Sequence, residues 1–285
     1  MARSVLQQQL ENLDELPIIP ETLNRVLHEL EDPTTSASTL EYIVREDPSL
    51  TAQLLKLANS PYYGAPRKVS SVAKAIVLVG FEEVRNLVIG LCLTKAFPSN
   101  VEVKGIRLRD LWLHSIGTAL ASQMLAEKVP QIDSDEMFTA GMVHDVGCAV
   151  MHYCFPEKLT AILESIADGS GSYLEAEEKY GITHTEVGAY LAATWGFSDM
   201  LINVIRYHHT PQGAGPNEKA AAIVFLADAL THKVGLGWAM DHADSRVLVP
   251  KILKLNGEIV KQVALTLKHK KQVIIDSWGD LLMTG

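Results

Sequence analysis

The chain has 285 residues, of which 47% are hydrophobic, and a formal net charge of −9. This length suits one large domain or two smaller ones with a sizeable core. The acidic balance argues against broad binding to a phosphate backbone, which needs clustered Lys and Arg, so we expect no direct nucleic-acid binding. Because no charge-free apolar run reaches the roughly 18 residues of a membrane helix, we also expect no membrane span or membrane partner.

The N-terminal segment and the cysteines favour a cytoplasmic location. MARSVLQQQLENLDEL lacks the long apolar stretch of a signal peptide. Cys92, Cys148 and Cys154 cannot all pair, and they lack the spacing of a zinc knuckle. We therefore expect buried thiols in a reducing compartment.

Helical patterns fill the N-terminal part of the chain. In SASTLEYIVRED, Ser38 and Glu41 have the spacing of a capping box. In DPSLTAQLLKLANS, Asp47 is the expected N-cap, with Pro48 at the favoured first helical position. Asn59 then follows the apolar stripe, and we interpret it as helix termination rather than as a ligand contact.

Two more helices are expected in VSSVAKAIVLVG and FEEVRNLVIGLCLTKAF, with a tight turn at Gly80. The next stretch, FPSNVEVKGIRLRD, is rich in turn residues and charges, and we interpret it as a boundary or a long connection. We find no alternating run that predicts a strand. The prediction is an all-α protein, with an N-terminal helical bundle over 1–97 packed on a second helical region over 105–285.

Helical patterns resume beyond this connection. They cover RDLWLHSIGTALASQMLAEK, DEMFTAGMVHDVGCAVMHYC, ITHTEVGAYLAATWG, DMLINVIRYHHT and NEKAAAIVFLADALTHKVG. Thr183 and Glu186 have capping-box spacing, and Gly196 is the expected C-terminal stop of the same helix. We expect HTPQGAGPNE to be a loop.

Ionisable side chains interrupt the apolar faces of these helices. Because residues three and four apart share a helix face, several of them point where a core residue would be expected. The set comprises His114, His144, Asp145, His184, His208, His209 and Asp228.

Two interpretations of this set remain open. A single histidine on an apolar face is usually an ordinary core residue with a hydrogen-bond partner. Burying all seven groups separately would be costly, whereas a shared divalent ion would satisfy several at once. Imidazole and carboxylate together suit iron, manganese, zinc, cobalt or nickel rather than calcium.

At this point the motifs resemble a known superfamily. LWLHS, MVHDVG and FLADAL are similar to the signature of the HD superfamily of metal-dependent phosphohydrolases: a His, an adjacent His-Asp pair and a distant Asp. This resemblance implies metal ligation by His114, His144, Asp145 and Asp228. The further histidines His184, His208 and His209 match positions used by two-metal members such as the HD-GYP phosphodiesterases, so one or two ions are implied.

The N-terminal half indicates the subfamily. LPIIP, REDPSLTAQLLKLANSPYYG and SSVAKAIVLVGFEEVRNL, in that order, resemble the HDOD domain, a family of bacterial signalling proteins related to the HD enzymes. The resemblance covers nearly the whole chain. It implies an HDOD helical subdomain over 1–97 and an HD-like helical subdomain over 105–285.

Two positions depart from the active enzymes. Those enzymes commonly have a lysine after the pair, as in His-Asp-x-Gly-Lys, whereas Cys148 stands here and cannot supply its charge. HD-GYP enzymes also have a glutamate after the His-His pair and a Gly-Tyr-Pro triplet, whereas Thr210 follows His209 and the loop reads PQGAGPNE.

Three functions follow from the resemblance. The leading hypothesis is a regulatory module of bacterial signal transduction that acts through protein partners, without turnover. The alternative is a metal-dependent phosphohydrolase acting on a nucleotide or a cyclic dinucleotide, in which metal-activated water attacks phosphorus. The third is a sensor that binds a metal or a nucleotide in the same pocket.

Overall fold

The structure is a computed structural model that describes residues 17, 19–30, 36–64, 68–97, 102–167, 169, 171–236 and 251–282. Two compact units divide the chain. Unit 1 comprises Met1–Pro17 and Asn100–His269, and unit 2 comprises Ile18–Ser99 and Lys270–Gly285. The subdomain limits expected from the sequence, 1–97 and 105–285, stay a prediction.

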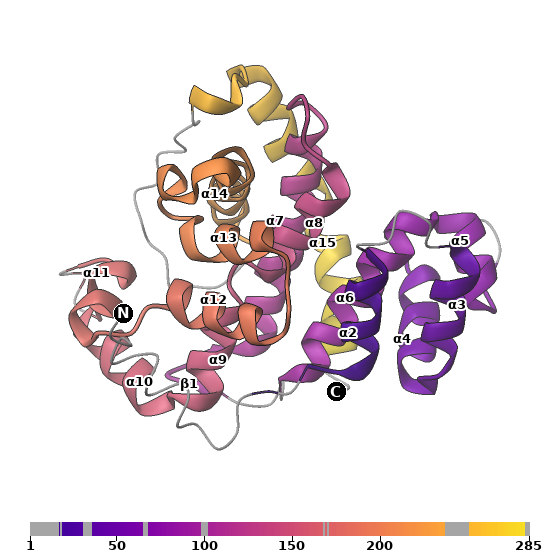
Figure 1. The fold of residues 1–285 in the computed structure, drawn as a ribbon, viewed down its shortest axis with the longest axis horizontal. Coiled ribbons are helices and arrows are strands. Elements are labelled where there is room, and N and C mark those ends of the chain that lie inside the picture. The colour runs from indigo at the N-terminus through magenta and orange to yellow at the C-terminus, as the bar shows by residue number, and fades with distance from the viewer. Residues whose placement is uncertain are drawn as a thin grey trace. The chain divides into compact units, whose positions relative to one another are not determined.

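The expectation of an all-α protein is confirmed, because helices dominate the described ranges (Figure 1). The strands in those ranges are β1 (Glu102–Val103) and β2 (Ile106–Arg107), which pair in antiparallel fashion. They form a hairpin inside the connection for which the sequence predicted no strand. Its turn needs two residues with positive φ, and Lys104 (φ 51°) and Gly105 (φ 81°) adopt it. None of the helices that the structure describes combines the length and hydropathy required to cross a membrane.

Unit 2 is built around the helix that follows Gly80, which packs against the four described helices before it. Gly80 itself adopts φ 108°, which explains the tight turn expected there. Its helices are α2 (Glu21–Leu30), α3 (Ala37–Arg45), α4 (Pro48–Ala58), α5 (Val72–Val79) and the central α6 (Phe81–Ala96), and residues from Lys270 onward of α15 (Gly257–Leu282) also belong to this unit.

Local capping fixes the helix starts in unit 2. Asp47 is the N-cap of α4, where its carboxylate accepts a hydrogen bond from Leu50 N at 2.9 Å, so the predicted cap is confirmed. The predicted capping box at Ser38 is wrong, since α3 begins earlier. Ser36 is its N-cap, and the Ser36 hydroxyl accepts from Thr39 N.

Asn59 ends α4, as its position after the apolar stripe predicted. Its side chain also fixes the chain after the helix: Asn59 Nδ2 donates to Val69 O at 2.8 Å, and Val69 N donates to Asn59 Oδ1 at 2.8 Å. Both ends of the amide are therefore used structurally.

Unit 1 contains two groups of packed helices. The long helix α7 (Leu108–Ala126) packs against α8 and α14, and α12 packs against α9 and α13. The other elements are α8 (Ser134–Val143), α9 (Val146–Cys154), α10 (Pro156–Ser165), α11 (Tyr173–Tyr180), α12 (His184–Thr194), α13 (Asp199–Tyr207), α14 (Glu218–Lys233) and the short 3₁₀ helices Pro211–Asn217 and Lys251–Leu253. The first of these 3₁₀ helices lies where the sequence predicted a loop.

The sequence predicted a single helix across DEMFTAGMVHDVGCAVMHYC, and this prediction is wrong. The segment forms two helices, α8 and α9, which are separated by His144 and Asp145. Tertiary packing explains the break. A Cβ on Gly147 would lie 1.9 Å from His184 O, so the backbones of α9 and α12 touch at this glycine. This close approach brings Asp145 next to His184.

Candidate metal centre

The seven ionisable residues predicted from the sequence lie together in unit 1. His114 lies on α7 and Asp228 on α14. The other five lie at helix ends: His144 and Asp145 between α8 and α9, His184 at the start of α12, and His208 and His209 directly after α13. Six of the seven are buried, with relative exposures from 0% to 8%. All seven belong to overlapping groups of possible metal ligands: His114, His144, Asp145, His184, His208, His209 and Asp228.

Small residues allow these helices to approach. A Cβ on Gly141 would lie 2.7 Å from Ala119 Cα, so α8 packs directly on the α7 backbone. A Cβ on Gly117 would lie 2.7 Å from Thr231 Cγ2, which sets the distance between α7 and α14. The histidine of α7 and the aspartate of α14 therefore meet because small residues line the helix contacts.

Asp145 is the centre of the cluster. Its Oδ1 lies 3.4 Å from His208 Nε2 and 3.6 Å from His184 Nε2. Its Oδ2 lies 3.3 Å from His144 Nε2 and 3.8 Å from His114 Nε2. One carboxylate thus faces two pairs of histidines with separate oxygen atoms, which is the arrangement of a bridging ligand in a two-metal site.

Asp228 and His209 extend the cluster in two directions. Asp228 Oδ1 lies 2.9 Å from His114 Nε2. His209 Nε2 lies 3.1 Å from His184 Nε2 and joins a set of four possible ligands with Asp145 and His208. Four separations among these ligand atoms lie between 3.1 and 3.6 Å, which is short enough for one ion with bonds of about 2 Å to bridge.

Hydrogen bonds orient the imidazole rings. Nδ1 of His144 donates to Gly141 O at 2.8 Å, and Nδ1 of His208 donates to Ile205 O at 2.9 Å. A carbonyl can only accept, so these contacts assign the proton to Nδ1 and leave the Nε2 lone pair facing the cluster. This is the outer-shell pattern that prepares histidines for a metal.

Several nitrogen and oxygen atoms of the cluster face one another at short range. His184 Nε2 and His208 Nε2 lie 3.4 Å apart, and two lone pairs at this distance repel unless a proton or a cation lies between them. His144 Nε2 and Asp228 Oδ1 are buried without a hydrogen bond of good geometry. The donor set therefore fits one or two divalent transition-metal ions.

The charges of the metal-free cluster are strongly coupled. Burial would raise the pKa of Asp145, but His144 and the other histidines outweigh it and hold that pKa well below its usual range. Burial would likewise raise the pKa of Asp228, and His114 and His232 overcome it to keep the carboxyl ionised. Both carboxylates are thus in the anionic form that binds cations.

The histidines respond to burial and to charge in different ways. Burial lowers the pKa of His208, and burial together with the charge of His208 lowers that of His209 well below the usual value. For His144 the effect of burial is outweighed by the charge of Asp145, so its pKa is raised. His208 and His209 are therefore neutral near pH 7, as metal ligands must be.

Sequence reasoning missed two residues of the site. Glu177 is fully buried and uses both carboxylate oxygens on His184: Oε1 accepts from His184 N at 3.0 Å, and Oε2 accepts from Nδ1 at 2.7 Å. His232 follows Asp228 by four residues on α14, and its Nε2 lies 3.3 Å from the Asp228 carboxylate. That spacing could have revealed His232, whereas Glu177 lies among exposed acidic residues and has no such signal.

The environment of Cys148 agrees with its lack of charge. The thiol is buried at 2% exposure, on the first turn of α9, and is not in a disulfide. Thr210 is exposed at the start of the 3₁₀ helix after His209. Neither residue supplies the charge that the active enzymes have at these positions.

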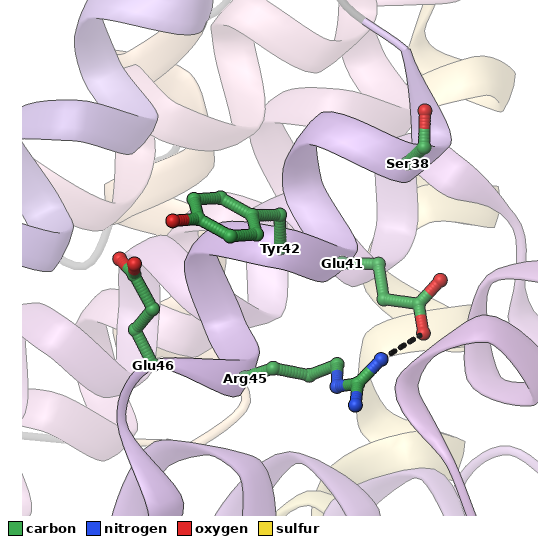
Figure 2. A pocket seen from close by; sticks show the side chains of 5 residues that line it. All are labelled: Ser38, Glu41, Tyr42, Arg45 and Glu46. Carbon is green, nitrogen blue, oxygen red and sulfur yellow. Dashed lines mark ion pairs between the residues drawn. The ribbon is translucent and has the colours of Figure 1, made fainter.

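A surface pocket of about 510 Å³ lies in unit 2 and is lined by residues of α3 and its C-cap (Figure 2). It is lined by charged and hydroxyl side chains, and an ion pair of 3.5 Å joins Arg45 to Glu41 across one turn. Tyr42 beside it is 61% exposed. Exposed pairs of this kind are solvated by water, so this pocket has no feature comparable to the buried cluster.

Comparison with known proteins supports the sequence motifs. The family model for the HDOD domain matches residues 16–211. A crystal structure from Marinobacter aquaeolei VT8, provisionally named a signal transduction protein, is similar over 100% of this chain and 62% of that chain, with a TM-score of 0.82 and 28% identity.

Two further similarities have a lower identity or cover a smaller part of the chain. A structure from Shewanella amazonensis SB2B, provisionally named a phosphohydrolase, matches 96% of this chain and 97% of that one, with a TM-score of 0.77 and 24% identity. At this identity it shows a shared fold. Ribonuclease Y of Pseudothermotoga lettingae is 31% identical over 118 residues, which are 41% of this chain and 18% of that protein.

The curated relatives are longer proteins, of which the matches span between 17% and 38% of the length. The family match is broader, because it takes in 16–211, more than half of this chain. From its motifs, its fold and this match, the chain belongs to the HDOD domain family.

Proposed function

We propose that the chain is a cytoplasmic regulatory module of bacterial signal transduction that acts through signalling proteins as partners. Its HD-type pocket would hold one or two divalent transition-metal ions. The observation that supports this proposal best is the buried cluster around Asp145, in which ligand atoms converge but the expected lysine is a buried cysteine. The similarity to the Marinobacter signal transduction protein supports the signalling context.

The metal would be held in two places that share Asp145. The ligands on the Oδ1 side are His184, His208 and His209, and those on the Oδ2 side are His114, His144 and Asp228. A bound ion would act as a Lewis acid and would neutralise the two anionic aspartates. The neutral histidines keep the net charge of the ligand set low, which suits iron, manganese, zinc, cobalt or nickel.

Weak or absent turnover follows from the charges at the site. Catalysis of phosphoryl transfer rests on positioning and on groups that stabilise the developing charge. The loss of one such group typically costs a factor of roughly 10² to 10³ in rate. Cys148 and Thr210 replace two of them, so we expect a metal-binding domain that signals without hydrolysis.

The second candidate is a metal-dependent phosphohydrolase that acts on a nucleotide or a cyclic dinucleotide. The two-sided geometry of Asp145 favours it, since two-metal clamps serve in-line displacement at phosphorus. The partial match to ribonuclease Y points in the same direction. A nucleotide also remains a candidate ligand without turnover, which would make the pocket a sensor.

The test uses the full chain purified without a metal-affinity tag. The protein is loaded with iron, manganese or zinc, and metal content is measured together with hydrolysis of generic and cyclic-dinucleotide phosphodiesters. We expect bound metal and no turnover above background. Cross-linking in the native host then compares wild type with Tyr42→Ala, an exposed residue of unit 2, and we expect the variant to change the set of cross-linked signalling proteins.

Three results would overturn the proposal. Robust turnover that disappears in Asp145→Ala would establish the phosphohydrolase instead. A protein that binds none of the three metals, with the helical signal of a folded chain, would remove the metal site. Specific binding of a nucleotide without turnover would assign the pocket to a sensor.

A further inference from the structure

Glu177 is a buried carboxylate on α11 that belongs to none of the groups of possible metal ligands among the described residues. Its relative exposure is 0%, and both of its oxygens accept from one residue, His184. Oε1 accepts from the backbone N of His184 at 3.0 Å, and Oε2 accepts from its ring Nδ1 at 2.7 Å. Removing a carboxylate from water to this depth is costly, so its two fixed contacts indicate a specific role.

The same residue fixes the corner between α11 and α12. Glu177 O accepts from Ile182 N at 3.1 Å, and Gly181 adopts φ 67° there, which glycine does without strain. Tyr173 lies one turn before Glu177 on the same helix face, is buried, and has its ring centroid 6.0 Å from that of His184. The buried face of α11 therefore contacts the cluster at His184.

These contacts determine which ring nitrogen of His184 can bind a metal. A carboxylate can only accept, so the proton of the neutral ring lies on Nδ1 and the lone pair lies on Nε2. Nε2 is the atom that faces the pocket, at 3.4 Å from His208 Nε2 and 3.1 Å from His209 Nε2. Glu177 thus holds His184 in the tautomer and the ring orientation that a metal ligand needs.

We propose that Glu177 is a positioning residue for metal binding and that it links occupancy of the pocket to the docking of α11 on His184. The inference rests on the proposed function, since it requires a metal-binding pocket. The link follows from thermodynamic reciprocity: if Glu177 strengthens metal binding through His184, bound metal strengthens the contact of α11 by the same factor. The outward face of α11 is exposed at Glu175, Glu178 and Lys179, so the effect of the metal reaches the surface of unit 1.

Glu177→Gln tests the two acceptor oxygens without changing the size of the side chain. The backbone N–H and the Nδ1–H of His184 both need an acceptor, whereas glutamine has one carbonyl oxygen and one NH₂ group. The backbone N–H cannot move its proton, so it takes the oxygen. The NH₂ group then faces Nδ1, which must accept, and the ring proton moves to Nε2, where it blocks metal ligation.

The matched control is Glu178→Gln, which makes the same change at the next, exposed residue of α11. NMR of metal-free, full-length, tag-free protein with isotope-labelled histidine assigns the tautomer of His184, whose signals are identified by their absence from His184→Gln. Each protein is then titrated with Zn²⁺ alone, and hydrogen exchange of the α11 amides is measured with and without the ion. Circular dichroism checks that each variant keeps its helices.

We expect wild type and Glu178→Gln to have the Nδ1–H tautomer at His184 and to bind zinc, with slower exchange of the α11 amides when the ion is bound. Glu177→Gln should have the Nε2–H tautomer and bind zinc roughly 10- to 100-fold more weakly, the usual cost of losing such a partner of a ligand. Zinc should slow the α11 amides of this variant less than those of wild type. A merely structural role would lower stability and leave the tautomer unchanged.

The inference fails if Glu177→Gln keeps the Nδ1–H tautomer or binds zinc as tightly as wild type. It also fails, whether or not the variant folds, if wild type has the Nε2–H tautomer at His184 or if zinc does not slow exchange in its α11. The metal-binding pocket itself stands after each of these results. A folded wild type that retains no zinc, iron or manganese contradicts the proposed function itself, so the two failures are distinguishable.

Discussion

Polar side chains make different kinds of contact in the two units. Asn59 and Asp47 are the examples from unit 2, and the buried histidine and aspartate cluster is the example from unit 1. In unit 2, the side chain of Asn59 pairs with both backbone groups of Val69, and Asp47 caps a helix. A donor meets an acceptor in each of these contacts. In unit 1, His184 Nε2 faces His208 Nε2, and Asp145 faces four histidines.

This difference distinguishes polar groups that stabilise the fold from polar groups that indicate a functional site. A polar group with a complete set of hydrogen bonds stabilises one conformation, and nothing more is needed to explain it. A group of acceptors held together by packed helices is unfavourable until a cation joins them, so its presence indicates a ligand. Substitutions in the two units should therefore affect different measurements.

Gly147→Ala should give the largest effect, because its Cβ would lie 1.9 Å from His184 O and 2.7 Å from Gly188 N. Backbone atoms cannot move aside cheaply, so we expect a loss of about 3 kcal/mol in the free energy of unfolding. Asp145 would move away from His184, and bound metal should fall. Urea unfolding of metal-free protein and metal content test this.

Gly257→Ala is the matched control for this substitution. A Cβ there meets nothing within 4 Å, and the residue begins α15. We expect it to be neutral or to stabilise by about 0.4 to 1 kcal/mol. Equal behaviour of the two alanine variants would show that the close contact of α9 and α12 is not what holds the site.

Asn59→Ala should be next in size, and it should act on stability alone. Two hydrogen bonds to Val69 are lost at about 1 kcal/mol each, so we expect a destabilisation of about 2 kcal/mol by urea unfolding. Metal content should match wild type. A drop in bound metal in this variant would break the separation between the two units.

The sequence predicted features that depend on local chemistry. The Asp47 cap, the Asn59 stop and the amphipathic helices follow from side chains close in sequence, and the structure has them. The HD and HDOD resemblance also led us to expect that seven residues distant in the sequence lie in one site. Their role as metal ligands stays a prediction.

Features that depend on distant packing were not predictable in this way. The contact of Gly147 with α12 beside the break at His144 and Asp145 joins segments that are distant in the sequence. The N-cap of α3 is Ser36 rather than Ser38, which shows that neighbouring hydroxyl residues compete for one cap. Glu177 joined the site only because the chain between α11 and α12 turns back and brings it to His184.

His152 offers a buried histidine of unit 1 that belongs to packing rather than to the cluster. Its Nε2 donates to Ile106 O at 3.0 Å, and burial lowers its pKa below the ordinary 6.5. The unfolded state therefore takes up a proton first as pH falls. The stability that neutral His152 contributes is full above about pH 6.5 and is lost as pH falls from there through the lowered folded pKa.

His152→Gln should reduce this acid sensitivity, since Gln cannot take up the proton. We expect the free energy of unfolding of metal-free protein to fall less between about pH 7.5 and 5.5 in the variant than in wild type. Metal content at pH 7.5 should not change. Parallel pH profiles would mean that His152 is not buried in its neutral form.

Arg45→Ala should have the smallest effect. Its side chain is 70% exposed, and its guanidinium pairs with Glu41 across one helical turn (Figure 2). Exposed pairs of this kind contribute about 0.5 kcal/mol or less. A loss above about 1 kcal/mol in thermal or urea unfolding would show that this charged surface of unit 2 contributes more than a solvated pair.

Metal content of the Asp145→Asn variant tests the central claim most directly. The substitution keeps the shape of the side chain but removes the charge and one of the two acceptor oxygens that face four histidines. We predict that tag-free wild type retains iron, manganese or zinc after desalting, and that the folded Asp145→Asn variant retains only background metal. Equal metal content in the two proteins, or none in wild type, would contradict a metal centre built around Asp145.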